Sequence, residues 1–260
     1  AIVTGASSGI GRSITLALAE AGVGLIVCAD VRIQPLTEGV KKPERKTHEE
    51  IEKRFGAGRA RFVKCDVTGP ACGMVELVEQ TVRWAGRLDI MVNNAGVGIF
   101  DIPLHEMKVA TWNQTISVNV NRMFLGSKHA IAQFLTQKPD VSGFRGTLIN
   151  VSSIGGVVGL MRCAAYCAAK AAIIGLTRAT ALEYADRGNR CNVILPGYIS
   201  TAMLQPIVDA SPAFAAYLDA GIPAGRLGTP GDVAGAATWL ADSTKSAYVT
   251  GVALPVDSGY

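Results

Sequence analysis

The sequence predicts an α/β fold in which helices cover both faces of a doubly wound parallel sheet. Short apolar runs alternate along the chain with longer helical patterns, as expected for repeated strand-helix-strand units. The runs are apolar at successive positions, so both faces of each strand are expected to be buried. A length of 260 residues, with 49% hydrophobic residues and no linker or repeat, fits a single three-layer α/β/α domain.

The expected elements follow one another in chain order and keep this alternation as far as residue 198. Strands are expected at residues 1–4, 24–29, 61–65, 88–92, 147–151, 191–195 and 252–256. Helices are expected at residues 10–21, 48–55, 71–84, 110–136, 165–185 and 231–241, with Thr47 as the candidate N-cap of the second. A basic, proline-containing loop occupies residues 32–46. Residues 199–228 break the rhythm, and long irregular connections of this kind are usually lids or binding loops.

Composition and charge exclude several classes of protein. The net charge of +4 comes without a dense basic run, so nucleic-acid binding is not expected. The longest apolar stretches are far shorter than the roughly 20 residues that a membrane helix needs, so no membrane association is expected. The three histidines have no carboxylate or cysteine at ligand spacing, which argues against a metal site. The six cysteines form no regular framework, which favours reduced thiols in a cytoplasmic protein.

The first strand runs directly into a glycine-containing turn, TGASSGIG at residues 4–11, which opens a helix. Because glycine has no Cβ atom, Gly5 permits a tight turn, Gly9 lets a pyrophosphate approach the backbone, and Gly11 lets helix and strand pack closely. The helix N-terminus offers amides and a partial positive charge to phosphates. An ordinary turn is the alternative interpretation, but the flanking strand and helix favour a dinucleotide site.

Asp30 ends the second strand, 19 residues after Gly11, where a carboxylate can accept hydrogen bonds from both hydroxyls of an adenine ribose. The same charge would repel a 2′-phosphate, so NAD is the preferred cofactor. Arg32, Lys41 and Lys42 follow in the basic loop and could instead hold that phosphate, which leaves NADP as the alternative.

Tyr166 and Lys170 are four residues apart at the start of the helix after strand five, so they share one helix face. A phenol with a pKa near 10 is a poor acid-base catalyst at neutral pH, and a nearby ammonium favours the phenolate. Ser152 and Ser153 end the preceding strand, at the edge where open α/β sheets bind ligands. One of these hydroxyls could bond the substrate oxygen while the tyrosine exchanges its proton.

Taken together, the motifs resemble those of the short-chain dehydrogenase/reductase family, in its single-domain Rossmann-fold form, over essentially the whole chain. They are TGASSGIG at 4–11, NNAG at 93–96, Asn119 in SVNV, Ser153 thirteen residues before Tyr166, YCAAK at 166–170 and PGYIST at 196–201. The resemblance implies an oxidoreductase that transfers hydride reversibly between NAD(P) and a secondary alcohol or ketone. An NADPH-dependent ketoreductase of acyl or polyketide substrates, or a non-catalytic dinucleotide sensor, are the alternatives.

The resemblance also implies residue roles at the matching positions. Tyr166 would be the general acid/base, Lys170 would lower its pKa and bind the nicotinamide ribose, Ser153 would polarise the substrate oxygen, and Asn119 would hold a water in a proton relay. Substrate contacts would come from Ser153 and Tyr166. Cofactor contacts would come from Gly5, Ser8, Gly9, Ile10, Gly11, Asp30, Asp66, Val67, Asn93, Ala95, Gly96, Tyr166, Lys170, Pro196, Gly197, Ile199 and Thr201.

The segment around 198–228 corresponds by resemblance to the family's substrate loop. It is rich in apolar and aromatic side chains, which favour a partly apolar substrate, although packing against the body of the protein or a partner subunit is an equal alternative. The family usually assembles as tetramers, and a homotetramer is therefore expected, with a dimer as the alternative.

Overall fold

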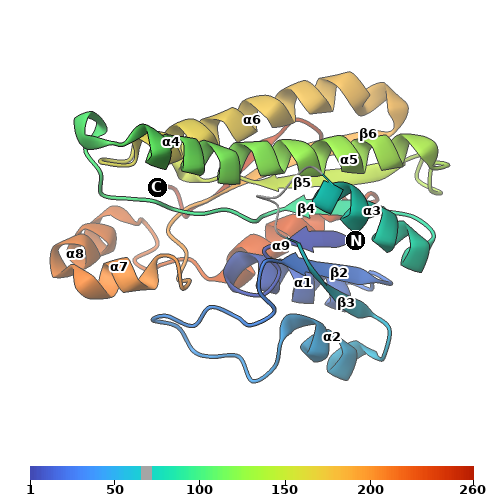
Figure 1. Ribbon diagram of the computed structural model, residues 1–260, viewed down its shortest axis with the longest axis horizontal. Coiled ribbons are helices and arrows are strands. Elements are labelled where there is room, and N and C mark those ends of the chain that lie inside the picture. Colours follow the sequence, from blue (N-terminus) through green and yellow to red (C-terminus); the bar gives the residue numbers. More distant parts are fainter. Residues whose placement is uncertain (66–71) are drawn as a thin grey trace.

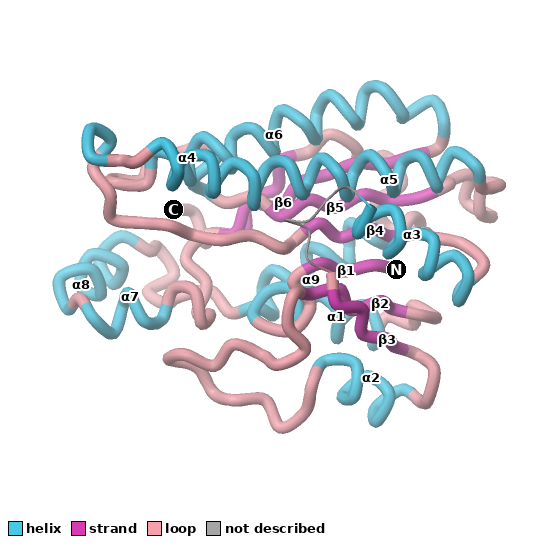
Figure 2. The backbone as a smooth tube through the Cα atoms, in the orientation of Figure 1, coloured by secondary structure: helices cyan, strands magenta, loops and turns pink. Residues whose placement is uncertain are grey.

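A computed structural model of the chain describes residues 1–65 and 72–260. In this part of the chain, seven parallel strands form one sheet in the order β3-β2-β1-β4-β5-β6-β7. Strands β1 to β6 of this sheet are labelled in Figure 2. The strand order reverses between β1 and β4, which creates a crevice at the carboxyl ends of these strands. The strands are β1 (Ile2–Thr4), β2 (Ile26–Asp30), β3 (Ala60–Lys64), β4 (Ile90–Asn93), β5 (Gly146–Val151), β6 (Asn189–Pro196) and β7 (Ala253–Val256).

Helices cover both faces of the sheet (Figure 1). One face carries α1 (Gly9–Glu20), α2 (Thr47–Phe55) and α9 (Pro230–Ala241). The other carries α3 (Cys72–Ala85), α4 (Val109–Ile116), α5 (Arg122–Thr136) and α6 (Ala164–Tyr184). The predicted single-domain, three-layer α/β/α fold is therefore confirmed.

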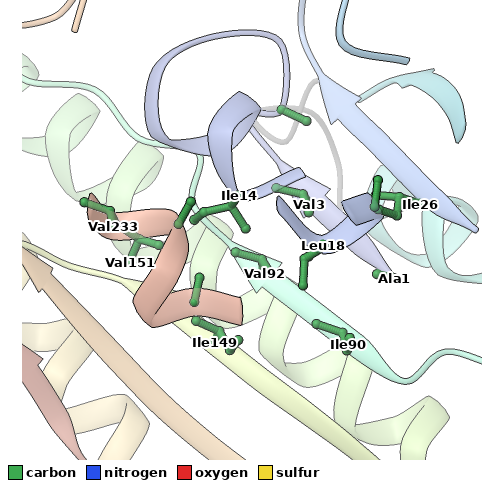
Figure 3. Packing of buried hydrophobic residues seen from close by; sticks show 14 of the residues in the cluster. Ala1, Val3, Ile14, Leu18, Ile26, Ile90, Val92, Ile149, Val151 and Val233 are labelled. Carbon is green, nitrogen blue, oxygen red and sulfur yellow. The ribbon is translucent and has the colours of Figure 1, made fainter. Parts of the chain in front are cut away.

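Alternate residues of the central strands separate the two halves of the core. Val3 and Val92 face α1 and α9, where they pack with Ile14, Leu18 and Val233 (Figure 3). Their neighbours along the strands face the opposite way and pack against α3 and α5; they include Ile2, Met91 and Leu148. Both strand faces are buried because helices lie on both sides, which explains the continuous apolar runs in the sequence.

The helix expected at residues 110–136 is interrupted. A π-helical turn, Ser117–Asn121, separates α4 from α5. Within it, the side-chain amide of Asn119 donates to the carbonyl oxygen of Thr115 at 3.0 Å, four residues earlier. A side chain that takes a helix carbonyl competes with the backbone amide that would otherwise bond it, and such turns recur at functional sites.

The segment expected to be irregular contains two short helices, α7 (Gln205–Ala210) and α8 (Pro212–Gly221). Pro206 and Pro212 occupy the first turns of α7 and α8, where a missing amide proton has no cost. Ser211 caps α8 by accepting a hydrogen bond from the amide of Phe214 at 3.2 Å. These two prolines therefore help to begin helices in a segment that was expected to be irregular.

The N-cap of α2 is Lys46, so the prediction of Thr47 at this position was wrong by one residue. The amide of Lys46 donates to the Glu49 carboxylate at 3.2 Å. Thr47 instead turns inward: its hydroxyl donates to the carbonyl oxygen of Ala6 at 2.7 Å and accepts from the Arg12 guanidinium at 3.0 Å. It thereby ties α2 to the glycine turn, a contact across 41 residues that no local pattern indicates.

Candidate active site

The glycine turn after β1 has the backbone shape that a phosphate cradle needs. Gly5 and Gly9 have φ angles of 66° and 52°, a region that favours glycine. A Cβ atom on Gly11 would lie only 2.2 Å from the carbonyl oxygen of Gly5, so no larger residue fits there without a shift. Ser8 is the N-cap of α1, and its side chain makes no capping hydrogen bond. The amides of this helix N-terminus can therefore serve a ligand.

Thr4 and Asn94 hold this turn in place, and neither was predicted to belong to the site. The Asn94 side-chain amide donates to the carbonyl oxygen of Thr4 at 2.9 Å. In return, the hydroxyl of Thr4 accepts from the backbone amides of Asn94 and Ala95 at 2.9 and 3.0 Å. The turn after β1 is thus bonded to the loop after β4, on both sides of the crevice. Both residues lie inside motifs quoted from the sequence, Thr4 in TGASSGIG and Asn94 in NNAG, but no local pattern predicted the bonds between them.

Asn93, expected as a cofactor contact, directs its side chain into the core. Its amide donates to the Ser127 hydroxyl at 3.2 Å and to the Asn150 side-chain oxygen at 3.0 Å. Asn150 in turn donates to the Thr177 hydroxyl at 2.9 Å. This buried polar chain links β4 and β5 to α5 and α6. The side chain of Asn93 therefore braces the sheet, and Asn94 rather than Asn93 supports the crevice.

Asp30 ends β2 beside the glycine turn, as predicted. Its carboxylate accepts from the backbone amide of Ser7 at 3.0 Å and from that of Arg32 at 3.3 Å. The Ser7 hydroxyl donates to the carbonyl oxygen of Arg32 at 2.7 Å, which closes a small ring of hydrogen bonds. The Asp30 carboxylate is therefore fixed at the end of the crevice that an adenine ribose would occupy. Asp66 and Val67, also expected here, lie outside the described residues.

The basic loop at residues 32–46 neutralises part of its own charge. Lys46 pairs with Glu49 at 2.8 Å, and Arg45 lies 3.4 Å from Glu44. The loop also reaches the substrate segment, because a Cβ atom on Gly39 would lie 2.7 Å from the side chain of Gln205 in α7. Figure 1 shows this loop extending toward α7 on the same side of the molecule.

The predicted catalytic residues converge at the carboxyl ends of β4 and β5. Ser153 follows β5, and its hydroxyl is hydrogen-bonded to the phenol of Tyr166. The Lys170 ammonium lies 5.6 Å from the centre of the Tyr166 ring and donates to the carbonyl oxygen of Val151 at 3.2 Å. The Phe100 ring packs edge-on against Tyr166, with 5.1 Å between ring centres.

Ser152 is excluded from the same role by its own hydrogen bond. Its hydroxyl donates to the carbonyl oxygen of Lys170 at 2.7 Å, which commits it to the backbone of α6. Ser153 instead accepts from the amide of Gly155 at 3.1 Å and reaches Tyr166. The geometry therefore favours Ser153, as the family resemblance implied.

Asn119 closes the site on the third side. Its side-chain oxygen accepts from the amide of Val97 at 3.2 Å, and its nitrogen donates to the carbonyl oxygen of Val97 at 3.0 Å. A Cβ atom on Gly96 would lie 2.7 Å from the Asn119 oxygen and 3.6 Å from the Lys170 nitrogen. Asn119 and Lys170 thus approach each other across Gly96, where only glycine leaves room.

The segment after β6 completes the contact between the two halves of the site. Ile199 is buried, and the methyl group of Thr201 lies 3.4 Å from where a Cβ atom on Gly9 would be. Gly197 packs as closely, because its Cβ position is 2.9 Å from Asp257. The Thr201 end of the expected cofactor segment, residues 196–201, therefore lies over the glycine turn.

Burial sets the protonation of the catalytic pair. It raises the pKa of the Tyr166 phenol above 10, and the hydrogen bond with Ser153 opposes this shift. Burial also lowers the pKa of the Lys170 ammonium to about 8. The sequence analysis expected a lowered pKa for Tyr166, but the pKa is raised, because burial raises it by more than the hydrogen bond with Ser153 lowers it.

An ion pair joins two loops beside Tyr166. Asp101 and Arg162 form an ion pair, and Arg162 also donates to the carbonyl oxygen of Asp101 at 3.1 Å. Both residues have positive φ angles, 63° and 60°, which are uncommon for residues other than glycine. The Asp101–Arg162 pair connects the loop after β4, which carries Phe100, to the loop before α6.

The comparisons with known proteins agree with this geometry. A family profile described as enoyl-(acyl carrier protein) reductase matches residues 5–260. The cis-4-hydroxycyclohexanecarboxylate dehydrogenase of Sinomonas cyclohexanicum is 37% identical over 261 residues, covering 100% of this chain and 95% of the relative. A short-chain type dehydrogenase/reductase from Mycobacterium marinum superposes with a TM-score of 0.85 at 29% identity, covering 100% of this chain and 94% of the other.

The chain belongs to the short-chain dehydrogenase/reductase family. A putative NAD(P)-dependent gluconate 5-dehydrogenase of this family from Beutenbergia cavernae, solved with bound NADP at low occupancy, also superposes with a TM-score of 0.85. It is 33% identical and covers 99% of this chain and 94% of its own. As a family member, the chain is an NAD(P)-dependent oxidoreductase acting on secondary alcohol or ketone groups.

The remaining expectations from the sequence concern a metal site, membrane-spanning helices and the cysteine thiols. Across residues 1–65 and 72–260, no cluster of three or more histidine, cysteine, aspartate or glutamate side chains could hold a metal ion. None of the helices in that part of the chain is long and apolar enough to cross a membrane. The thiols of Cys28 and Cys191 are free and buried, as expected, whereas those of Cys163 and Cys167 are free and half-buried beside Tyr166.

Proposed function

We propose that this dehydrogenase prefers NAD and oxidises cyclic secondary alcohols, with Tyr166 as the acid/base. The observation that carries the proposal is the meeting of Ser153, Tyr166 and Lys170 at the sheet edge, beside a glycine turn overlaid by Thr201. A reacting alcohol between these groups would face a nicotinamide bound over that turn. The bound nicotinamide supplies the hydride acceptor, and the protein residues handle the proton.

In alcohol oxidation Tyr166 acts as the phenolate: it takes the proton of the substrate hydroxyl, and the Ser153 hydroxyl bonds the same substrate oxygen. Lys170 offers its ammonium to the nicotinamide ribose and favours the phenolate electrostatically. Asn119 holds a water that passes the proton outward, which is supported by its place opposite Lys170 across Gly96.

The residues at the crevice fit a dinucleotide. Gly5, Gly9 and Gly11 leave the phosphates room, and the N-terminus of α1 offers amides to them. The fixed Asp30 carboxylate supports NAD, because it would bond the ribose hydroxyls and repel a 2′-phosphate. Arg32 has an exposed side chain that could serve NADP, so a cofactor titration decides between the two.

The substrate class is supported by the apolar walls of the site and by one relative. Phe100 lies on Tyr166, and the segment 198–228 contributes Tyr198, Phe214 and Tyr217, whose rings contact one another. Flat or ring-shaped apolar groups pack well against such walls. The relative from Sinomonas is named for a hydroxylated cyclohexane ring.

The test is turnover of a panel of cyclic secondary alcohols and their ketones, followed by nicotinamide absorbance with both dinucleotides. Tyr166→Phe should lower kcat by at least about 10³-fold while leaving dinucleotide affinity within about twofold. Tyr248→Phe, at a fully exposed tyrosine, is the matched control and should be silent. Full turnover by Tyr166→Phe would overturn the assignment.

Two other outcomes identify the rival functions. Turnover with NADPH and acyl ketones alone would indicate a ketoreductase. Dinucleotide binding without turnover of any alcohol or ketone would indicate a non-catalytic sensor.

We further propose a cytoplasmic homotetramer. Phe124 of α5 and Leu182 of α6 are apolar and exposed, 47% and 85%, on the outer faces of these helices, which supports subunit contacts there. Free thiols support a reducing compartment. Light scattering at micromolar concentration checks the assembly: a tetramer mass is expected, a dimer mass would replace it, and a monomer mass would contradict it.

A further inference from the structure

Three phenols form a chain of hydrogen bonds along one wall of the substrate site. The hydroxyls of Tyr217 and Tyr260 lie 2.5 Å apart, and those of Tyr260 and Tyr198 lie 3.5 Å apart. The rings of Tyr198 and Tyr260 meet edge to face, with 5.1 Å between centres. Phe214 packs on Tyr198 and stacks on Tyr217, which holds the three rings in one cluster.

The Tyr198 end of this chain lies at the catalytic edge of the sheet. In the pairing of β5 with β6, Val151 lies opposite Ile194, and the amide of Ser152 donates to the carbonyl oxygen of Ile194 at 2.8 Å. Ser153 and Tyr198 leave these neighbouring strands at the same edge. The thiols of Cys163 and Cys167 influence the pKa of both Tyr166 and Tyr198, so both phenols lie near the same two thiols.

Proton counting shows that the chain has one donor to spare. Three phenols carry three O–H protons, and their two mutual hydrogen bonds use two of them. Either hydroxyl of each pair can be the donor, so the two contacts do not by themselves assign the remaining proton to one end of the chain.

Tyr198 is the half-buried end of the chain and makes the longer contact, 3.5 Å, so its hydroxyl can turn toward a bound substrate, whereas Tyr217 at the other end makes the 2.5 Å contact and is 53% exposed. We propose that Tyr198 donates a hydrogen bond to a second oxygen atom of the substrate, so that the site selects cyclic secondary alcohols bearing a further hydroxyl, carbonyl or carboxylate oxygen. The inference rests on the proposed function, because it places the reacting carbon at Tyr166. It adds a polar specificity contact to walls that are otherwise aromatic.

Discrimination follows from the geometry of the wall. A substrate with a second oxygen at the right position engages the Tyr198 proton, whereas cyclohexanol leaves that proton without a partner from the substrate. A hydrogen bond between uncharged groups changes affinity by about three- to tenfold. A substrate carboxylate would gain more, because a charged acceptor strengthens the bond.

The experiment compares kcat/KM for cyclohexanol with that for each isomeric cyclohexanediol in the intact enzyme. Tyr198→Phe keeps the ring contacts and removes only the hydroxyl. It should lower kcat/KM for the best diol by about three- to tenfold, mainly through KM, and leave cyclohexanol within about twofold. Tyr248→Phe removes a hydroxyl from a fully exposed tyrosine outside this chain and is the matched control, expected to leave the diol-to-cyclohexanol ratio unchanged.

The outcomes separate this inference from the function on which it rests. An equal loss for cyclohexanol and every diol in Tyr198→Phe would overturn it and indicate a structural role or a bond to water alone. No loss for any diol in Tyr198→Phe would overturn it as well. Turnover of cyclohexanol in the same assay would still support the proposed dehydrogenase function. No turnover of cyclohexanol or diols by the unmodified enzyme would reject the proposed substrate class, and this inference with it.

Discussion

Replacing Gly11 by alanine tests whether the cofactor crevice depends on the close approach of two backbone segments. The added Cβ atom would lie 2.2 Å from the carbonyl oxygen of Gly5 and 2.5 Å from the side-chain nitrogen of Asn94. The nearer obstacle is backbone, so it cannot rotate away as a flexible side chain would. Forcing an extra carbon into such a packed site costs about 1–3 kcal/mol.

Part of this cost is offset by helix propensity, because Gly11 lies within α1. Alanine favours a helix over glycine by roughly 0.5–1 kcal/mol. The net loss in free energy of unfolding for Gly11→Ala is therefore about 1 kcal/mol, within a range of about 0–2.5 kcal/mol, and the melting temperature should fall by about 2–4 °C for a domain of this size. Gly235→Ala in α9 is the matched control, since nothing lies within 4 Å of its Cβ position, and it should gain about 0.5–1 kcal/mol.

The assay is urea and thermal unfolding of both variants, followed by circular dichroism without dinucleotide. A dinucleotide titration then measures the Kd, which should rise about tenfold or more in Gly11→Ala, because the turn that offers its amides is displaced. If Gly11→Ala gained stability as Gly235→Ala does and bound dinucleotide with unchanged affinity, the close-approach argument would be refuted.

Three further predictions follow from individual side chains. Asp30→Ser should raise the ratio of NADP to NAD in kcat/KM by about tenfold or more, because it removes a negative charge from the ribose site; an unchanged ratio would assign cofactor choice elsewhere. The buried Lys170, with its pKa near 8 against 10.5 when unfolded, takes up fewer protons folded than unfolded, so its contribution to stability rises from pH 8 to about 10.5. The free energy of unfolding of the unmodified protein minus that of Lys170→Met should therefore be about 2 kcal/mol larger at pH 10 than at pH 7. The same difference at both pH values would contradict this. Asn150→Leu, which removes the shared partner of Asn93 and Thr177, should cost about 2 kcal/mol or more in urea unfolding, and a smaller loss would show that the buried chain rearranges.

Local patterns predicted the parts of the site that lie close together in the sequence. The spacing of Tyr166 and Lys170 on one helix, and the place of Asp30 at a strand end, follow from helix and strand geometry alone. The glycine turn could be predicted because Gly5 and Gly9 adopt positive φ angles, which other residues rarely adopt. These features need no knowledge of how distant segments pack.

The sequence by itself therefore determined the parallel sheet with helices on both faces, the glycine turn and the Tyr166–Lys170 pair, because periodicity and spacing are local properties, whereas it missed α7, α8 and the break between α4 and α5. Tertiary structure alone decided that Asn93 faces the core and that Asn119 sits in a π-helical turn. It also decided the direction of the Tyr166 pKa shift and the pairing of Tyr198 with Tyr260, 62 residues away. Each of these depends on burial or on contacts between segments far apart in the chain, and the physical reason is that solvent exclusion and packing exist only once the fold has formed.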